Sequence, residues 1–457
     1  MSFLALDFPY QSDSAALFAP FAQRPWSVFL DSGQPQSEQG RYDIISWGPR
    51  STLVTRGAIS GVRDGDQLSL SREDPFLLLQ RMLGVARGGL ENLPFCGGAI
   101  GYFGYDLARR LERLPILATD DTAAPELAVG IYDWALVVDH AQQRSWLVGG
   151  DGECLRARRD ELYSASARHG KSETTFYTVG PILCNITHPE YLHRIEQIQR
   201  YIQDGDCYQV NFARRFSINA SGDPWVAYQR LRQLNPAPFG AFLNTPGCQV
   251  LSSSPERFLY CRAGQVETRP IKGTCPRGLN SAQDARLAEA LLHSSKDRAE
   301  NLMIVDLLRN DLGKVCLPGS IVVPELFKLE SFIRVHHLVS TVQGRLAPDQ
   351  TALTLLRACF PGGSITGAPK LRAMQIIEEM ETHRRALYCG TIGYIGFDGT
   401  MDSNITIRTL QYCKGEVHLW AGGGIVADSD PEEEYQETYH KASALLDLLQ
   451  QMRLGRR

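Results

Sequence analysis

The chain has 457 residues, of which 43% are hydrophobic and 21% charged, and its 47 basic and 51 acidic side chains leave a formal net charge of −4. That length suits about three average domains or one large composite fold, and the composition is that of an ordinary globular protein with a sizeable core. The balanced charge excludes a general attraction to nucleic acid or anionic membranes, and no segment approaches the roughly 18 apolar residues of a membrane helix.

Two features of the sequence favour a cytoplasmic enzyme. The N-terminus, MSFLALDFPYQSDS, is a poor signal peptide because Asp7 interrupts its apolar part and no basic residue precedes Arg24. The 11 cysteines are scattered and form neither a CxxC pair nor a zinc-type spacing. Reduced thiols therefore suit this chain better than a disulfide framework.

Three regions follow one another along the chain. Residues 1–150 are an N-terminal region of short strand-like segments, and residues 134–150 within it have the pattern of two strands joined by a polar turn. Residues 151–186 are polar, have helical potential and are the best candidate for a connector. Residues 187–457 carry sharper patterns, and we take them as a second domain.

A helix followed by a strand opens this second domain. Thr187 and Glu190 have the spacing of a capping box, apolar residues then recur at helical intervals, and Gly205 ends the helix. The next segment, CYQVNFARRF, alternates apolar and polar residues, which predicts a half-buried strand with Gln209 on its polar face. Further helices are expected over residues 296–309, after Pro369 and after Pro431, with Asp430 and Glu433 forming the cap of the last one.

Two glycine-rich segments, GAIGYFGYD (98–106) and GTIGYIGFD (390–398), agree at six of nine positions. Two strands of one intertwined sheet system would explain the agreement, and chance is the alternative. Strands and helices do not alternate regularly along the chain, which argues against a doubly wound sheet. We therefore predict an α+β fold in which large antiparallel or mixed sheets carry helices.

Acidic residues gather on two predicted helices. The helix KDRAENLMIVDLLRNDLG contains Glu300, and the last helix places Glu434, Glu437 and Lys441 on one face. One interpretation is a solvated acidic first turn that complements the helix dipole. The other is a magnesium site, because Mg²⁺ binds through one or two carboxylates and takes further oxygens from water and an anionic substrate.

Glycine segments and one arginine point to an anionic substrate. FPGGSITGAPK has Ala-Pro where a nucleotide-binding P-loop needs Gly-Lys-Ser/Thr, so nucleotide binding is not expected. This segment and AGGGIV can still present backbone N–H groups to an anion. Arg408 stands on a predicted strand beside Ile405 and Ile407, where it needs either a buried ion-pair partner or a substrate anion.

Lys272 stands in an unusual stretch, RPIKGT, between Pro270 and Gly273. Proline fixes the backbone and glycine frees it, so a tightly packed loop is expected. The lysine is either a surface residue of a turn or a chemically active amine, and these residues alone leave both interpretations open.

A series of motifs, in order along the chain, resembles the chorismate-utilising enzymes, a family that includes anthranilate synthase component I and the isochorismate synthases. The motifs are SSSPERF, ETRPIKGT, RAENLMIVDLLRNDLG, PGGSITGAPK, CGTIGYIG, ITIRTL and AGGGIVADSDPEEEYQETYHKA. The resemblance covers residues from about 187 to the end, and the N-terminal region resembles the amine-transferring members. It implies the fold of anthranilate synthase component I, with two intertwined subdomains.

The resemblance also implies a set of site residues. Glu256 would be the acid that helps the ring hydroxyl leave, with His337 near it, and Gln209 fills the position of a water-activating lysine in isochorismate synthases. Water is therefore not the expected nucleophile. The implied magnesium ligands are Glu300 and Glu437, with Glu434 close by, and the implied chorismate-binding groups are Arg408, Tyr394, Lys441, Thr274, Gln209 and the backbone of Gly422, Gly423 and Gly424.

Within the family, lysine at position 272 is typical of members that aminate C4 of chorismate, and alanine is typical of members that make anthranilate. Lys272 would add to C2 while the C4 hydroxyl leaves with a proton from Glu256, and ammonia would then add at C4 and expel the lysine. The product would be 4-amino-4-deoxychorismate, for p-aminobenzoate and folate biosynthesis. Lys272 would have to be neutral for part of the time, and the alternative is that it blocks ammonia from C2 or binds a carboxylate.

The resemblance implies a partner and a second ligand. No segment resembles a glutamine amidotransferase, so a separate glutaminase subunit would supply the ammonia. Relatives have a tryptophan pocket, here implied at Ser32, Tyr42, Pro238 and Phe239, with its occupancy left open. The alternatives are an anthranilate-forming enzyme, disfavoured by Lys272, and a catalytically silent subunit that binds chorismate or tryptophan, disfavoured by the intact glutamates.

Overall fold

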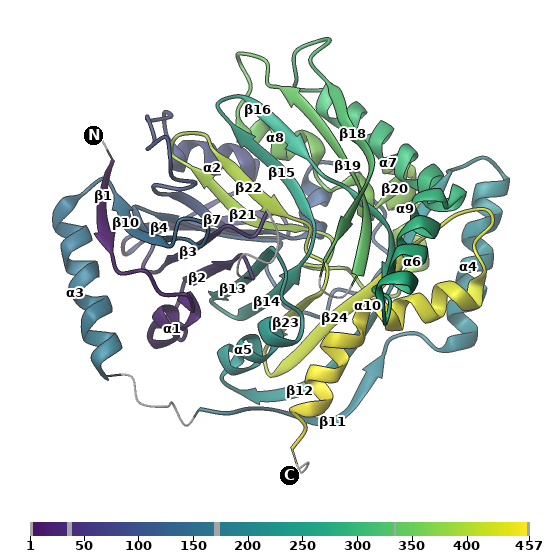
Figure 1. Cartoon of the computed structure of the whole chain (residues 1–457), viewed down its shortest axis with the longest axis horizontal. Coiled ribbons are helices and arrows are strands. Elements are labelled where there is room, and N and C mark those ends of the chain that lie inside the picture. The colour runs from purple at the N-terminus through teal and green to yellow at the C-terminus, as the bar shows by residue number, and fades with distance from the viewer. Residues whose placement is uncertain (1–2, 34–38, 169–173, 333–334, 455–457) are drawn as a thin grey trace.

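The computed structural model describes residues 3–33, 39–168, 174–332 and 335–454. Within them, two antiparallel sheets of twelve strands each form the centre of the molecule, and most of the helices lie around them (Figure 1). No described helix is long and apolar enough to cross a membrane.

The first sheet has β20 paired beside β12 and otherwise follows a single path. Its strands, in spatial order, are β1 (Leu4–Phe8), β10 (Arg144–Gly149), β9 (Trp134–Asp139), β3 (Tyr42–Ser46), β2 (Ser27–Asp31), β13 (Phe239–Thr245), β14 (Cys248–Ser254), β23 (Thr409–Cys413), β24 (Glu416–Ile425), β12 (Gln209–Gly222) and β11 (Phe176–Cys184), with β20 (Gly367–Ala368) off the path.

The second sheet has β18 paired beside β19. Its strands, in spatial order, are β17 (Ile271–Pro276), β19 (Val335–Arg345), β16 (Gln265–Thr268), β15 (Arg257–Arg262), β22 (Met401–Asn404), β21 (Thr391–Gly396), β7 (Gly98–Phe103), β8 (Leu127–Tyr132), β4 (Ser51–Arg56), β5 (Ile59–Asp64) and β6 (Gln67–Ser71), with β18 (Val322–Ser331) off the path.

Ten α-helices and three short 3₁₀ helices lie within the described residues. The α-helices are α1 (Ser14–Phe18), α2 (Pro75–Leu83), α3 (Gly152–Arg168), α4 (His188–Gln203), α5 (Pro224–Leu234), α6 (Ser281–His293), α7 (Ser295–Gly313), α8 (Ala352–Cys359), α9 (Lys370–Met380) and α10 (Pro431–Gln451). The 3₁₀ helices are Ala19–Phe21, Tyr105–Arg110 and Gly363–Ile365. Helix α10 packs on β24 and against α4, in the region to the right of the sheets in Figure 1.

Both sheets combine strands from the two ends of the chain, which confirms the predicted α+β architecture of intertwined sheets and helices. The two glycine-rich segments form neighbouring strands, with β7 antiparallel to β21 and Gly101 opposite Gly393. A Cβ atom would lie 2.1 Å from the carbonyl oxygen of Ala128 at Gly101, and 2.2 Å from that of Asp402 at Gly393. The repeated glycines therefore allow close approach of the next strand on each side.

Several local predictions are confirmed and others are corrected. The capping box of Thr187 and Glu190 starts α4, and Asp430 caps α10, although Glu433 meets that cap through its backbone N–H. Residues 134–150 form the hairpin of β9 and β10. Within residues 151–186, expected to be a connector, the described segments include α3 and β11, and β11 is an edge strand of the first sheet.

The strand CYQVNFARRF is more deeply buried than predicted. Gln209 and Asn211, expected on a polar face, are 2% and 8% exposed, whereas Tyr208 lies outside the strand and is 71% exposed. Strand β12 is an interior strand, paired with β24 on one edge and with β11 and β20 on the other, and it also packs against α4 and α9.

The expectation of free cysteines is wrong for one pair. Cys248 and Cys413 form a disulfide between β14 and β23, with their Cα atoms 4.5 Å apart. These strands are antiparallel neighbours, so the two cysteines face each other directly. The other nine cysteines are free.

Candidate active site

Lys272 lies on strand β17, where a bulge replaces the expected loop. The strand pairs with β19 so that Thr274 is opposite His337, and the pairing is irregular just before Thr274. Within this irregularity Gly273 has a φ of +79°. A Cβ atom at Gly273 would lie 2.9 Å from Oδ1 of Asp297 on α7, so glycine permits this close packing. The bulge leaves Lys272 half-buried rather than in an exposed turn.

Three carboxyl groups share the electrostatic environment of Lys272. Burial is the largest influence on Glu256, Glu300 and Glu437 and acts to raise the pKa of each, while the positive charge of Lys272 acts to lower it. Burial prevails at Glu300, whose pKa is raised. The pKa of Glu437 is lowered in spite of burial, because Lys441 adds both its charge and a hydrogen bond. The structure therefore brings residues far apart in the sequence around one amine.

Glu256 is held between β14 and β15 and is 5% exposed. Burial raises the pKa of its carboxyl to about 7, although a hydrogen bond from Ser364 acts in the opposite direction. The Ser364 hydroxyl donates this hydrogen bond to Oε1 of Glu256 over 2.9 Å. A carboxyl group with such a pKa is available as a proton donor near neutral pH. Sequence reasoning missed Ser364, although it belongs to the glycine segment that was expected near an anion.

Helix α10 carries two glutamates and a lysine against β24. Nζ of Lys441 lies 2.5 Å from Oε1 of Glu437 and donates a hydrogen bond of 3.0 Å to the carbonyl oxygen of Gly422. Glu434 is 4% exposed, and its pKa is raised by burial and by the charge of Glu437. A Cβ atom at Gly423 would lie 2.8 Å from Oε2 of Glu434, so this glycine leaves space beside the carboxylates.

The described residues contain no group of three or more His, Cys, Asp or Glu side chains close enough to hold a metal ion by themselves. Glu300, Glu434 and Glu437 nevertheless influence one another, since the charge of Glu437 raises the pKa of the other two. Glu434 is buried, Glu300 half-buried and Glu437 exposed. Glu434 and Glu437 lie beside Gly423, in the glycine part of β24. Carboxylates that repel one another in this way are oxygen donors of the kind that a hard cation requires. The residues present therefore fit such an ion together with water and a substrate anion.

A cavity of about 220 Å³ adjoins these residues and is lined in part by His337, Arg408 and Lys441. Burial lowers the pKa of Arg408 while the charge of Glu256 acts to raise it, and no carboxylate in the described part of the chain forms an ion pair with its guanidinium. The alternative of a buried ion pair is therefore not what the structure shows. A half-buried arginine that faces a cavity and forms no ion pair with a carboxylate suits a substrate anion.

The two glycine segments differ in local structure from the expected loops, since one lies in a strand and the other contains a 3₁₀ helix. AGGGIV lies in β24, where Gly422, Gly423 and Gly424 pair with β12. Strand β23 pairs with β24 only up to His418, so the edge of the glycines that faces away from β12 has no partner strand among the described residues. In PGGSITGAPK, the glycines permit close packing, as a Cβ atom at Gly363 would lie 2.6 Å from Leu307.

Tyr394 and Gln209, both expected to bind substrate, do not line the 220 Å³ cavity. Tyr394 lines a different cavity, with its ring 5.3 Å from that of Phe95. Gln209 lies against Gly424, where a Cβ atom would be only 1.9 Å from Nε2 of the glutamine. Both amide atoms of Gln209 are buried without a hydrogen-bond partner among the described residues, so the side chain is available to a ligand.

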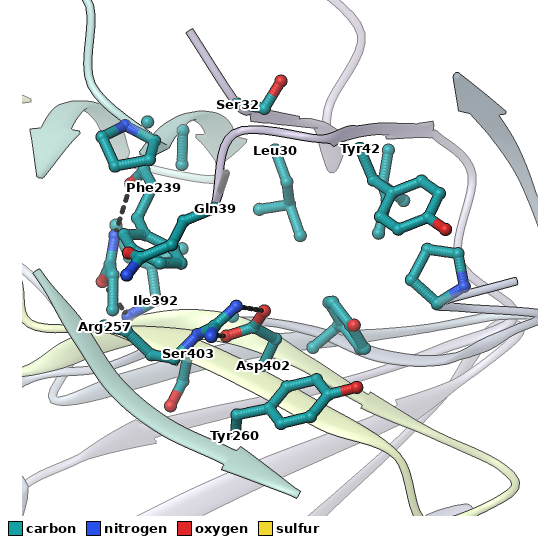
Figure 2. A pocket seen from close by; sticks show the side chains of 18 of the residues that line it. Leu30, Ser32, Gln39, Tyr42, Phe239, Arg257, Tyr260, Ile392, Asp402 and Ser403 are labelled. Carbon is teal, nitrogen blue, oxygen red and sulfur yellow. Dashed lines mark hydrogen bonds and ion pairs between the residues drawn. The ribbon is translucent and has the colours of Figure 1, made fainter. Parts of the chain in front are cut away.

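The cavity that Tyr394 lines has a volume of about 410 Å³ and is shown in Figure 2. The four residues expected to form a tryptophan pocket all line it, namely Ser32, Tyr42, Pro238 and Phe239. The ion pair between Arg257 and Asp402, 2.9 Å long, forms part of its wall. Ser32 and Pro238 also line the 220 Å³ cavity, so the two cavities share a wall. The ligand of this cavity stays a prediction.

The sequence profile of a family described as chorismate binding enzyme matches residues 27–447. Aminodeoxychorismate synthase component 1 of Klebsiella aerogenes is 48% identical over 97% of this chain and 98% of its own length. The protein of the same name from Escherichia coli K12 is 46% identical over 96% of this chain and 97% of its own length. The crystal structure of anthranilate synthase component I from Streptococcus pneumoniae superposes on this chain with a TM-score of 0.79. The two sequences are 31% identical, and the match covers 88% of this chain and 91% of that one.

Proposed function

The chain belongs to the chorismate-binding enzyme family, and from this membership we propose that it converts chorismate and ammonia to 4-amino-4-deoxychorismate. The observation that carries the proposal is the position of Lys272, whose amine shares its surroundings with Glu256, Glu300 and Glu437. The two relatives reported above that are named aminodeoxychorismate synthase component 1 are 46–48% identical, against 35–37% for two relatives named anthranilate synthase component 1.

The reaction has two displacement steps in this proposal. The neutral amine of Lys272 forms a bond to C2 of the ring, the ring double bonds shift, and the C4–O bond breaks. Glu256 gives its proton to the departing oxygen, which leaves as water, and the carboxyl group is left as a carboxylate. Ammonia then forms a bond to C4, the double bonds shift back, and the C2–N bond to Lys272 breaks. A raised pKa of about 7 suits Glu256 to the first step.

Substrate carboxylates are bound by the cations around the 220 Å³ cavity. Arg408 is half-buried and forms no ion pair with a carboxylate of the described residues, and Lys441 lines the same cavity beside the free edge of the glycine strand. His337 is neutral near pH 7, because burial and then the charge of Arg408 lower its pKa to about 3. A neutral ring lets Arg408 and Lys441 act on the substrate without a third positive charge.

Glu300 and Glu437 would hold a magnesium ion, with Glu434 beside them. The ion would supply positive charge to a carboxylate of the substrate, which completes its coordination together with water. Lys272 and Lys441 now offset the negative charge of these glutamates. We expect Mg²⁺ to be required for turnover, and a separate glutaminase subunit to supply ammonia, as the name component 1 of the relatives suggests.

The proposal is tested by identifying the product. The purified chain is incubated with chorismate, MgCl₂ and ammonium chloride at slightly alkaline pH, and the product is identified by mass and retention time. 4-Amino-4-deoxychorismate that forms with Mg²⁺ and not after chelation supports the proposal. Anthranilate would overturn it in favour of the alternative amination at C2, and chorismate that stays unchanged even with a glutaminase partner would point to a binding subunit.

A further inference from the structure

The segment that carries Ser364 is fixed on both sides of that residue. Ser364 is the middle residue of the 3₁₀ helix Gly363–Ile365. The carbonyl oxygen of Ile365 accepts a hydrogen bond of 2.9 Å from Arg385, which is itself 1% exposed. Thr366 donates a hydrogen bond of 3.0 Å to the carbonyl oxygen of Gly362. The Ser364 hydroxyl is therefore held by a turn that the surrounding core keeps in place.

The backbone of Glu256 is fixed as well. Its carbonyl oxygen accepts a hydrogen bond of 3.0 Å from the N–H of Ile405, and Oγ of Ser254 donates to the carbonyl oxygen of Ile405 over 2.5 Å. The carboxyl group also accepts a hydrogen bond from the backbone N–H of Ile271, the residue before Lys272. The hydrogen bond between Ser364 and Glu256 thus joins two fixed segments of the chain and is made to the carboxyl group of Glu256 itself.

We propose that Ser364 is a positioning residue for proton transfer, whose hydroxyl occupies Oε1 of Glu256 and leaves Oε2 to carry the reactive proton. A carboxylic acid carries its proton on one of its two oxygens and donates it from that oxygen. A fixed hydrogen-bond donor at the other oxygen therefore decides which oxygen bears the proton. The inference rests on the proposed function, since it takes Glu256 as the acid.

The step that Ser364 assists is the loss of the ring hydroxyl. The O–H bond at Oε2 of Glu256 breaks, the proton joins the departing oxygen, the C–O bond breaks and water leaves. The electron pair for this displacement comes from the attacking amine. After the step, the carboxylate keeps the hydrogen bond from Ser364, which is stronger to a charged acceptor and so favours the transfer.

Other titratable groups near Glu256 also influence its pKa, in the wild-type chain and in the variants alike. Lys272 and Lys441 act to lower its pKa, and Arg408 and Cys389 also interact with it electrostatically. All of them stay in place when Ser364 is replaced. A change in the pH dependence of Ser364→Ala therefore reports the missing hydroxyl.

The experiment compares Ser364→Ala and Ser364→Thr with the wild-type chain, and uses Ser69→Ala on the exposed strand β6 as the matched control. Chorismate consumption is followed with MgCl₂ at constant free ammonia from pH 6 to 9. We expect Ser364→Ala to lower kcat roughly 10- to 100-fold with less than a threefold change in KM, and Ser364→Thr to restore most of the loss. The descending limb of the Ser364→Ala profile should move up by about one pH unit, since the donor that stabilised the carboxylate is gone.

A second readout does not depend on turnover. Infrared difference spectra against Glu256→Gln give the pH midpoint of Glu256 protonation, which should be higher in Ser364→Ala than in the wild type. An unchanged midpoint and kcat in Ser364→Ala, or an equal loss of rate in the Glu256→Gln background, would overturn the inference. The proposed function fails separately, because anthranilate as the wild-type product would contradict it while chorismate consumption still tests Ser364.

Discussion

Thr274 and His337 lie opposite each other on β17 and β19, with the threonine hydroxyl 2.8 Å from Nδ1 of the imidazole. The contact fixes the ring at the edge of the 220 Å³ cavity, where its other face meets Phe332 at a centroid distance of 5.3 Å. Burial, followed by the charge of Arg408, lowers the pKa of His337 to about 3. The hydrogen bond thereby connects β17, the strand that carries Lys272, to the neutral imidazole of His337 in the wall of the proposed substrate cavity.

The first prediction concerns acid stability. An unfolded histidine binds a proton below about pH 6.5, whereas His337 in the folded chain stays neutral down to about pH 3. Its contribution to the free energy of unfolding is complete above pH 6.5 and is lost as the pH falls, by up to about 1.4 kcal/mol per pH unit. His337→Asn should therefore flatten the decline in stability between pH 6.5 and 4, as measured by urea unfolding. His193→Asn, at an exposed site of α4, should keep the wild-type slope, and an unchanged slope in His337→Asn would contradict the prediction.

The second prediction concerns Lys272. Lys272→Ala removes the proposed nucleophile, so formation of 4-amino-4-deoxychorismate should fall at least about 100-fold. Ammonia can then reach C2, and any residual product should be anthranilate, which is detected by its fluorescence and mass. Lys328→Ala, a surface variant that removes the contact of Lys328 with Glu325, should leave rate and product unchanged. A Lys272→Ala enzyme that still makes 4-amino-4-deoxychorismate at the normal rate would exclude the covalent role.

Much of the architecture could be predicted from the sequence because its signals are local. The capping box of α4, Asp430 before α10 and the hairpin of β9 and β10 are set by residues within a few positions of one another. That the segments of β7 and β21 belong to one sheet system was one of two interpretations of their shared glycine pattern, and the structure pairs the two strands directly. The order of strands in the two sheets depends on contacts between residues far apart in the sequence, which local patterns do not reveal. The burial of Gln209 on an interior strand likewise has no signal within its own segment.

The candidate site was predicted unevenly for the same reason. Glu434, Glu437 and Lys441 share one helical face by spacing alone, and the structure places Lys441 2.5 Å from Glu437. Ser364 was missed because its partner Glu256 is 108 positions away in the sequence. Tyr394, expected to bind substrate, lies on β21 and lines the 410 Å³ cavity, a position that its own segment does not reveal.

The third prediction concerns Arg214, which is 1% exposed on β12 and supports helix α10. Its guanidinium carbon lies 4.0 Å from the ring centroid of Tyr435 and 3.9 Å from that of Tyr439, and its Nε donates a hydrogen bond of 2.7 Å to Thr438. These contacts hold the turn of α10 that also carries Glu434 and Glu437.

Arg214→Met keeps the length of the side chain and removes the cation and the donors. We expect the free energy of unfolding to fall by about 3 kcal/mol, and the Mg²⁺ concentration for half-maximal activity to rise, because the glutamates lose their support. Arg214→Lys should not restore either property, as an ammonium group cannot stack between two rings as a planar guanidinium does. Arg63→Met, at an exposed position of β5, is the control. Wild-type stability and Mg²⁺ dependence in Arg214→Met would refute this account.

The fourth prediction tests the space beside the carboxylates. A Cβ atom at Gly423 would lie 2.8 Å from Oε2 of Glu434 and 3.7 Å from Oε1 of Glu437, so Gly423→Ala forces the Glu434 side chain to move. Because the strand has ordinary backbone geometry there, we expect the fold to persist with a Tm close to that of the wild type. If the carboxylates bind Mg²⁺, half-maximal activity should require roughly tenfold more of the ion.

The control is Gly150→Ala, because a Cβ atom at Gly150 meets no atom within 4 Å, and this variant should behave as the wild type. A Gly423→Ala enzyme with normal Mg²⁺ dependence would place the ion elsewhere, whereas loss of chorismate binding at saturating Mg²⁺ would show that the glycine edge serves the substrate instead.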